Sequence, residues 1–338
     1  MAIRTTVVGS WWPLEEYADD LERFHRGELS DEEGTKLLDA AATEAIKQQR
    51  ELGLDEWTGG EYFADDFIQH LAKRLDGIEI DDPGADDIFD YDDVAHVKIV
   101  GEVAAPNGLG FAEAYERERE LPGGVNKATV VSALEVTANF DQDDELERQL
   151  PEVTRIVNEE IQALAALGCP HIAIDAPRAG SAVNMGEMTA DEAVELLAPC
   201  FEGVTGVKRG IHICNGSLRG RPSSSVLRAA PWVDILKGLD GVIDIVHLEL
   251  SYFSEWRERD AFKDLPQSME LQAGIVDEAS YGLQSVKKVR DRAADWARVV
   301  GEERLWIAPC CGFGRHPLRN VPLLHQKMEN LVEAAQTL

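Results

Sequence analysis

The sequence has little positive charge and no long apolar run, and we expect no leader segment. Its 338 residues include 11 lysines and 22 arginines against 63 acidic residues, which gives a formal net charge of −30. This balance argues against nucleic acid as a partner, because phosphate backbones are bound by clustered basic side chains. No run of 18 apolar residues is present, and a strand-like run begins almost directly after Met1. We therefore expect a cytoplasmic protein that does not contact a membrane.

The acidic residues are spread along the chain instead of forming a tail, with clusters at residues 81–82, 86–87 and 141–145. Such a surface suits high salt, because charge repulsion is screened within about 3 Å at ~1 M salt. We expect a halophilic source. An ordinary acidic cytosolic protein is the alternative.

Cysteine is also scarce, and its number is odd. Five cysteines in a chain without a secretory signal indicate reduced thiols. Cys214, Cys310 and Cys311 are therefore free to act as ligands or nucleophiles. Cys169 and Cys200 are expected to be packing residues.

Short β-rich runs alternate with amphipathic helices along the chain, which indicates a (β/α)8 barrel of the TIM type in one domain, residues 1–338. One of nine expected strands is surplus, and we assign it to a β-hairpin excursion around residues 80–105. A doubly wound open sheet is the alternative, but no Gly-rich phosphate loop follows the first strand. The expected helices are 31–52, 145–167, 189–201 and 282–300, and the expected strands are 5–10, 56–60, 97–103, 127–132, 171–175, 210–214, 242–249, 269–276 and 305–308.

Possible metal ligands stand at the ends of late strands. His212 and Cys214 are two residues apart on one strand, so their side chains point to the same face. Glu249 ends another apolar run, and Cys311 follows a third. A tetrahedral zinc site needs four N, S or O donors, or three and an open position. In a barrel the carboxyl ends of the strands form the active mouth, so these donors should meet there, facing the strand-end carboxylates.

Five segments carry a resemblance to one known family. In their order they resemble cobalamin-independent methionine synthase, in its zinc-bearing catalytic barrel, over nearly the whole chain. The chain has one barrel's length and is similar to the short, single-barrel members. The segments are Thr5-Thr-Val-Val-Gly-Ser-Trp-Trp-Pro13, Gly53-Leu-Asp-Glu-Trp-Thr-Gly-Gly-Glu61, His212-x-Cys214, the strand-end Glu249 and Pro309-x-Cys-Gly312.

The resemblance implies a catalytic Zn2+ and methyl transfer to the homocysteine thiolate, which gives methionine. The implied zinc ligands are His212, Cys214, Glu249 and Cys311. Zinc with such ligands can accept a substrate thiol and hold it deprotonated. The carboxylate is the hardest of these donors, so we expect Glu249 to be the labile ligand. By chemistry alone, His247 competes with Glu249 and Cys310 with Cys311; the family pattern selects Glu249 and Cys311.

The resemblance also assigns the substrate end of the site. It implies that Glu61 and Asp175 hold the amino group of homocysteine, and that the turn Val8, Gly9 and Ser10 binds its carboxylate. An ammonium group is suited to paired anions, and a Gly-Ser turn offers N–H and hydroxyl donors. The alternative is that Glu61 and Asp175 only cap the helices that follow them.

Two departures from the family pattern affect the methyl donor. Asp175-Ala-Pro177 stands where the family has Asp-Glu-Pro, and Ala279 stands where it has a proton-handling His. The nitrogen of methyltetrahydrofolate or methyltetrahydropteroylglutamate needs a proton on leaving, whereas a corrinoid leaves as cobalt(I). Our hypothesis is therefore that the donor is a methylcorrinoid protein, or that Asp277 or Glu278 replaces the His.

Two other functions stay open from the residues alone. One is a related zinc-dependent thiol alkyltransferase acting on coenzyme M or another small thiol, although a sulfonate thiol has no use for two carboxylates. The other is a non-catalytic, metal-binding partner of a full-length enzyme.

Overall fold

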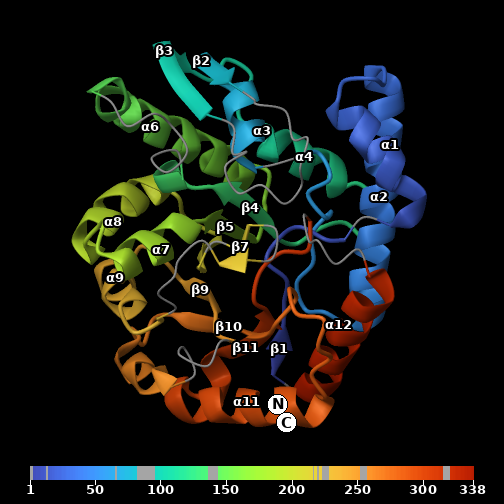
Figure 1. Ribbon diagram of the computed structural model, residues 1–338, viewed down its shortest axis with the longest axis vertical. Coiled ribbons are helices and arrows are strands. Elements are labelled where there is room, and N and C mark those ends of the chain that lie inside the picture. The colour runs from blue at the N-terminus through green and yellow to red at the C-terminus, as the bar shows by residue number, and fades with distance from the viewer. Residues whose placement is uncertain are drawn as a thin grey trace.

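Seven parallel strands form the central sheet in the computed structural model (Figure 1), which describes residues 3–12, 14–64, 67–81, 96–135, 144–215, 217–218, 221–222, 228–251, 257–314 and 320–338. Their order in the sheet is β1-β11-β10-β9-β6-β5-β4, and every neighbouring pair is parallel. The strands are β1 (Arg4–Thr5), β4 (Ala128–Val131), β5 (His171–Asp175), β6 (Lys208–Ile213), β9 (Ile245–Glu249), β10 (Glu270–Val276) and β11 (Leu305–Pro309).

An irregular segment, residues 55–60, lies between the two edge strands. The Asp55 N–H donates to the Thr5 carbonyl at 3.1 Å, and the Asn126 N–H, just before β4, donates to the Trp57 carbonyl at 3.4 Å. Gly60 makes a single parallel bridge to Ser10. The expected barrel is therefore confirmed. Residues 55–60 stand where its eighth strand would be, between β1 and β4.

The expectation of a regular strand at 56–60 was wrong. Gly60 has φ +91°, in the left-handed region that favours glycine, and Glu61 follows at φ +61°. These angles turn the chain out of the extended conformation before a ladder can form.

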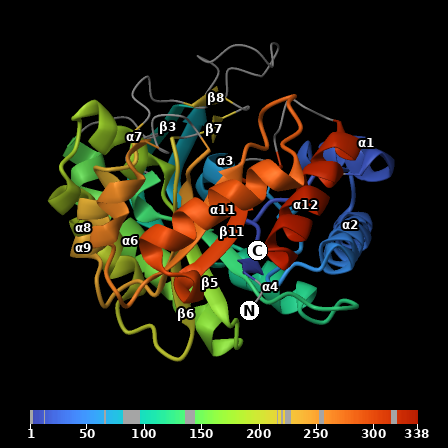
Figure 2. The same cartoon turned by 90° about the horizontal axis from the view of Figure 1, so that it is seen from below.

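Helices surround the sheet (Figures 1 and 2). Helix α2 (Asp31–Leu52) has the predicted bounds because its ends are encoded locally: Ser30 and Glu33 form a capping box, and Gly53 closes the helix at φ +87°. The other helical elements are α1 (Glu15–His25), α3 (Phe67–Arg74), α4 (Phe111–Glu118), α6 (Asp144–Ala166), α7 (Pro177–Met185), α8 (Ala190–Leu197), η1 (Ala198–Phe201), α9 (Trp232–Gly238), η2 (Arg259–Asp264), α11 (Val286–Val300), η3 (Glu302–Arg304) and α12 (Val321–Gln336).

A separate antiparallel hairpin confirms the excursion expected around residues 80–105. Its strands are β2 (Asp76–Asp81) and β3 (His96–Ala104), and residues 82–95 between them lie outside the described part of the chain. The hairpin stands at one end of the molecule, beyond α3 (Figure 1). A second, very short pair is β7 (Ser217–Leu218) with β8 (Arg221–Pro222).

An aromatic cluster fixes the end of the first strand against the loop after β11. Trp11 and Trp12 are stacked with ring centroids 3.8 Å apart, and Phe313 meets both rings edge-on. All three side chains are buried. Such pairs contribute about 0.5–1.5 kcal/mol each beyond the burial of their area. They hold Ser10 beside the segment that carries Cys311.

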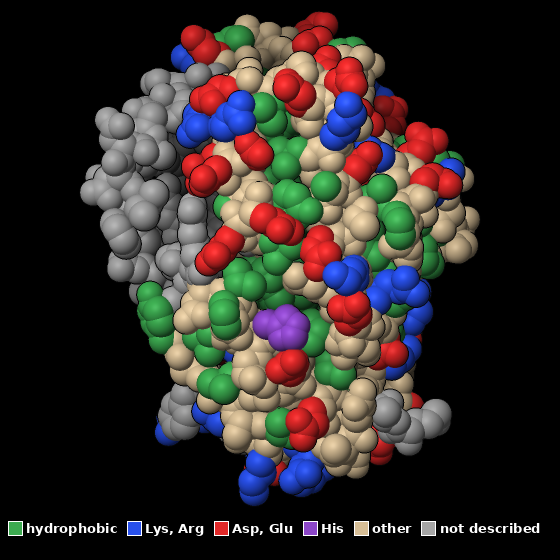
Figure 3. All heavy atoms as spheres, turned by 90° about the vertical axis from the view of Figure 1, so that its right-hand side faces the viewer, with side chains coloured by type: hydrophobic (Ala, Val, Ile, Leu, Met, Phe, Trp, Pro, Cys, Tyr) green, Lys and Arg blue, Asp and Glu red, His purple; other side chains and the backbone are tan. Residues whose placement is uncertain are grey.

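Acidic side chains are numerous on the side of the molecule in Figure 3, where basic side chains also occur. Figure 3 views the side formed by α1, α2 and α12, where acidic side chains are scattered among apolar and neutral ones. Among the described residues, no helix is both long and apolar enough to span a membrane.

Candidate functional site

Three of the predicted metal ligands meet in one cluster, in which His212 and Cys214 are buried and Cys311 is partly exposed. His212 lies in β6, Cys214 lies just after it, and Cys311 follows β11. Their ligand atoms all lie within 4.8 Å of one another, and Cys311 Sγ is 3.7 Å from His212 Nε2. The two-residue spacing of His212 and Cys214 does put both side chains on one face, as the strand period requires.

The imidazole of His212 contacts a second buried histidine. Its Nδ1 is 2.7 Å from His247 Nδ1, and His247 Nε2 is 2.9 Å from the Pro309 carbonyl oxygen. Burial and the charge of Lys127 lower the pKa of His212 to about 3. Burial likewise lowers the pKa of His247 well below its ordinary value. Both rings are therefore neutral near pH 7, which is the form that binds metals.

The two thiols of the cluster are held in the protonated form in the absence of a cation. A hydrogen bond to Cys311, burial and neighbouring negative charge raise the pKa of Cys214 well above that of an ordinary thiol. The pKa of Cys311 is also raised overall. The hydrogen bond to Cys214 lowers it, but burial and the charge of Glu278 together outweigh that effect. A divalent metal would reverse this balance by stabilising both thiolates. Two sulfurs and one imidazole nitrogen suit zinc.

Glu249, the fourth predicted ligand, is near the cluster but bound elsewhere. It ends β9, the strand beside β6, and its side chain is buried. Its Oε2 accepts hydrogen bonds from the backbone N–H of Asn215 at 2.8 Å and from the Asn215 side-chain Nδ2 at 3.0 Å. The close group of three does not include it.

The alternative cysteine faces another direction. Cys310 Sγ donates to the Gly274 carbonyl of β10 at 2.9 Å. Cys311, not Cys310, is therefore the thiol that the structure brings to His212.

Of the two predicted carboxylates, Asp175 lies beside the cluster. Asp175 ends β5, with Oδ1 3.9 Å from His212 Nε2, and within the described residues this buried oxygen has no hydrogen-bond partner. Burial raises the pKa of Asp175 to about 7. Burial, with the charges of Asp175 and Glu118, raises the pKa of Glu61 to about 8. An unpaired buried carboxylate is costly, so these groups favour a cationic ligand.

Glu61 is held in a strained conformation. It is the one non-glycine residue with positive φ in the part of the chain that the structure describes. Such backbone strain is more common at functional sites than elsewhere. A Cβ on Gly9 would lie 1.9 Å from Glu61 Oε1, so the absent side chain at Gly9 makes room for this carboxylate.

Ser10 connects the first strand to the cysteine segment. Its Oγ accepts a hydrogen bond from the Gly314 N–H at 3.1 Å, and its carbonyl accepts one from the Phe313 N–H at 3.2 Å. The predicted turn of Val8, Gly9 and Ser10 thus adjoins both Glu61 and the loop after Cys311.

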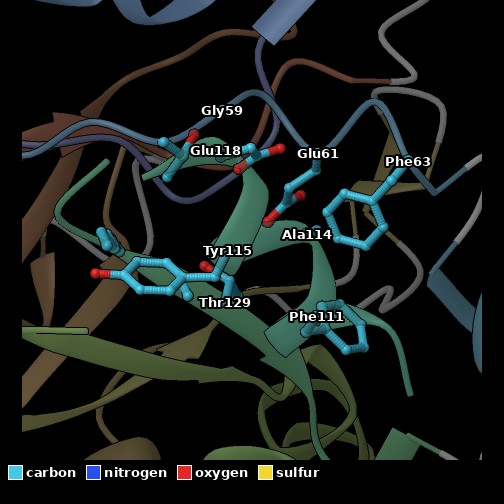
Figure 4. A pocket seen from close by; sticks show the side chains of 11 residues that line it. Gly59, Glu61, Phe63, Phe111, Ala114, Tyr115, Glu118 and Thr129 are labelled. Carbon is cyan, nitrogen blue, oxygen red and sulfur yellow. The ribbon is translucent and has the colours of Figure 1, made fainter. Parts of the chain in front are cut away.

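A small pocket lies beside Glu61. Two of the residues that line it, Glu118 and Lys127, were not predicted as site residues from the sequence. Figure 4 shows the Glu61 and Glu118 side chains lining it, with Phe63, Phe111 and Tyr115. Burial raises the pKa of Glu118 to about 7. The buried Lys127 also lines the pocket, and its Nζ donates to the Val7 carbonyl at 2.5 Å. Neither residue stands in a recognisable motif.

The two acidic candidates for proton transfer differ in position. Asp277 Oδ1 accepts the Ser280 N–H at 3.0 Å, so it stabilises its own loop. Glu278 is buried, and its Oε2 accepts the Cys311 N–H at 3.1 Å. Burial and the charge of Glu249 raise the pKa of Glu278 to about 8. Lys327 fixes this loop by donating to the carbonyls of Asp277 at 2.6 Å and Glu278 at 3.3 Å.

Comparisons with known proteins agree on one family. The family model described as cobalamin-independent synthase, catalytic domain, matches residues 3–337. A methionine synthase of Sulfolobus acidocaldarius is 23% identical over 97% of this chain and 90% of its own length. A 5-methyltetrahydropteroyltriglutamate–homocysteine methyltransferase of Acidithiobacillus ferrooxidans is 24% identical over 99% of this chain, which spans only 41% of that protein.

The fold has solved counterparts. A B12-independent methionine synthase from a Shewanella species, in complex with selenomethionine, superposes with a TM-score of 0.75 at 20% identity, over 91% of this chain and 89% of that one. At this identity the likeness bears on the fold alone.

Proposed function

Since the chain belongs to the family of cobalamin-independent synthase catalytic domains, we propose that it is a Zn2+-dependent S-methyltransferase that converts homocysteine to methionine. The observation that carries this proposal is the close group of His212, Cys214 and Cys311 beside the carboxylate of Asp175. Such a group suits a metal that activates a thiol, and the carboxylate suits the ammonium group of an amino acid. We propose that residues 1–338 act as one catalytic barrel domain.

His212 Nε2 and the sulfurs of Cys214 and Cys311 would hold the zinc. When bound, the metal would supply the positive charge that keeps a substrate thiol deprotonated at neutral pH. The protein contributes a buried, neutral imidazole and two adjacent thiols that follow different strands, so little rearrangement is needed to assemble the donors.

In this proposal Glu249 is the labile zinc ligand, and Asn215 binds its carboxylate when it is away from the metal. Two N–H groups of Asn215 converge on Glu249 Oε2, so the carboxylate has a satisfied position away from the three permanent donors. Hydrogen bonds to a charged group stabilise it by about 1.5–3 kcal/mol each. We propose that Glu249 occupies this position when the substrate sulfur takes the fourth place.

Asp175 and Glu61 would bind the substrate ammonium group. Both residues are partly buried, which raises the pKa of each carboxyl group, and a bound cation would offset the cost of ionising them. The turn of Val8, Gly9 and Ser10 would bind the substrate carboxylate. Coenzyme M, which has no amine, would leave both carboxylates unpaired, so this site favours homocysteine over that alternative.

The methyl donor is either a methyltetrahydropteroylglutamate or a methylcorrinoid protein. For the folate donor, Glu278 is better situated than Asp277 to replace the absent His, because Glu278 lies against Cys311 while Asp277 bonds within its own loop. A catalytic role for Asp277 stays a prediction, as do the cytoplasmic location and the halophilic source.

The test is methionine formation by the full chain loaded with zinc, with homocysteine and each donor in turn. We expect methionine with at least one donor, and its loss in the Cys311→Ser variant. Cys310→Ser is the matched control, because this thiol bonds to the β10 backbone and should be dispensable. Absence of methionine with both donors would contradict the proposal. Turnover with the folate donor alone would exclude the corrinoid.

A further inference from the structure

We propose that His247 is a positioning residue that holds His212 in the tautomer whose Nε2 carries no proton and faces the two cysteines. The inference rests on the proposed function in that it takes this cluster to be the zinc site. It adds a residue that touches neither the metal nor the substrate. His247 would act only through the proton on His212.

The Pro309 carbonyl oxygen can only accept a hydrogen bond, and this determines where the protons lie on the two imidazole rings. The Pro309 carbonyl oxygen lies 2.9 Å from His247 Nε2, so this nitrogen must be the donor. His247 is buried, and its two ring nitrogens face the Pro309 carbonyl and the His212 ring, so no carboxylate in these contacts favours a second proton. The neutral ring then has a lone pair on Nδ1. His212 Nδ1, at 2.7 Å, must donate its proton to that lone pair. His212 Nε2 is therefore left unprotonated.

This unprotonated nitrogen is on the side of the ring where the metal donors are. His212 Nε2 lies 3.7 Å from Cys311 Sγ and belongs to the group that includes Cys214. Only an unprotonated imidazole nitrogen can bind a metal, and the hydrogen bond on the other nitrogen decides which one that is.

The opposite tautomer is disfavoured by the same contacts. A proton on His212 Nε2 would leave two lone pairs facing each other at Nδ1. His247 could relieve this only by moving its own proton to Nδ1, which would leave Nε2 unable to donate to the Pro309 carbonyl. Both rings are buried, so water cannot easily replace the lost bond.

The fold determines this arrangement at three strands. His212 in β6 and His247 in β9 are directly paired in the parallel ladder. Pro309 ends β11, two residues before Cys311. The contact from His247 to Pro309 therefore joins the strand of one metal donor to the segment of another, across the intervening β10.

The test begins with the metal-free wild-type protein. Nitrogen-15 NMR of the imidazoles distinguishes the two tautomers, and we expect the proton of His212 on Nδ1. A proton on Nε2 would overturn the proposal. This result does not depend on catalysis, so a protein without methyltransferase activity but with this tautomer would refute the proposed function and leave the inference intact.

Two variants then test whether His247 is the cause. His247→Leu removes the acceptor, and we expect a shifted tautomer and zinc affinity lower by about 10- to 100-fold. In His247→Asn the side-chain oxygen can replace Nδ1 as acceptor, so the tautomer and most of the zinc affinity should be retained. His70→Leu is the control, because His70 is another buried histidine bonded to a carbonyl, that of Leu109 at 2.8 Å.

The variants also separate positioning from a merely structural role. If His247→Leu keeps the wild-type tautomer and zinc affinity, the proposal is wrong. It is equally wrong if His247→Asn loses zinc as severely as His247→Leu does. Should His247→Leu not fold, the wild-type spectrum and the Asn variant still decide the question.

Discussion

The carboxylate of Glu249 is bound by Asn215 through two hydrogen bonds to one oxygen, at 2.8 Å from the backbone N–H and 3.0 Å from the side-chain amide. Asn215 directly follows the predicted ligand Cys214, so the residue that receives the carboxylate is fixed to the metal cluster itself. This position is where the proposed labile ligand would lie after the substrate sulfur displaces it.

Replacing Asn215 by Ala should weaken homocysteine binding. The change removes one of the two hydrogen bonds to the displaced carboxylate, about 1.5–3 kcal/mol, so Glu249 would compete more strongly with the substrate sulfur. We expect the homocysteine Kd of the zinc-loaded protein, measured by calorimetry, to rise about tenfold while zinc stays bound. An unchanged Kd, or loss of zinc, would count against the labile-ligand role.

Asp175→Asn and Glu61→Gln should each weaken homocysteine binding by roughly 10- to 100-fold, the loss expected for a charge-assisted contact. The matched control is a ligand rather than a variant. 4-Mercaptobutyrate has the thiol and the carboxylate of homocysteine but no amine, so its affinity should change little. If both ligands lose affinity equally, the two carboxylates act on the fold or the metal instead of the ammonium group.

The stability of the fold should fall in acid through Glu56. Burial would raise the pKa of this carboxyl, but His171, Lys127 and the Thr6 hydroxyl lower it to about 2. A lowered pKa means that the stabilisation is present above about pH 4.5 and is lost as the pH falls towards 2. We expect Glu56 to contribute up to about 3 kcal/mol to this loss, seen as a flatter pH dependence of the free energy of unfolding in Glu56→Gln. Parallel curves for the two proteins would contradict this.

Salt should stabilise the protein well beyond the physiological range. The net charge of −30 is spread over the sequence, and repulsion among exposed carboxylates is screened within about 3 Å at ~1 M salt. We expect Tm to keep rising as KCl increases from about 0.2 to about 2 M. A plateau at the low end of that range would favour an ordinary acidic protein over a halophilic one.

Local signals in the sequence were enough to predict much of the fold. Helix α2 has the predicted bounds because its cap at Ser30 and its end at Gly53 depend on nearby residues alone. The strand at 171–175 was equally clear. The segment 56–60 was mistaken for a strand because its residue types do not show that Gly60 and Glu61 adopt positive φ.

The site was predicted less completely, because its supporting residues depend on long-range contacts. The spacing of His212 and Cys214 was sufficient to put both in one cluster. Nothing near His247 in the sequence shows that the Pro309 carbonyl, 62 residues away, orients it. The same holds for Lys127 and for Asn215, whose roles come from strands that pair far apart in the sequence.

X-ray absorption at the zinc edge, with and without homocysteine, tests the central claim most directly. With Cys214 and Cys311 as the permanent sulfur donors, we predict two sulfurs around the metal in the free protein and three after homocysteine is added, with one fewer oxygen. In Glu249→Gln, zinc should stay bound, but the change in the number of its oxygen neighbours on adding homocysteine should differ from that of the wild type. A sulfur count that does not change on adding homocysteine would contradict the account.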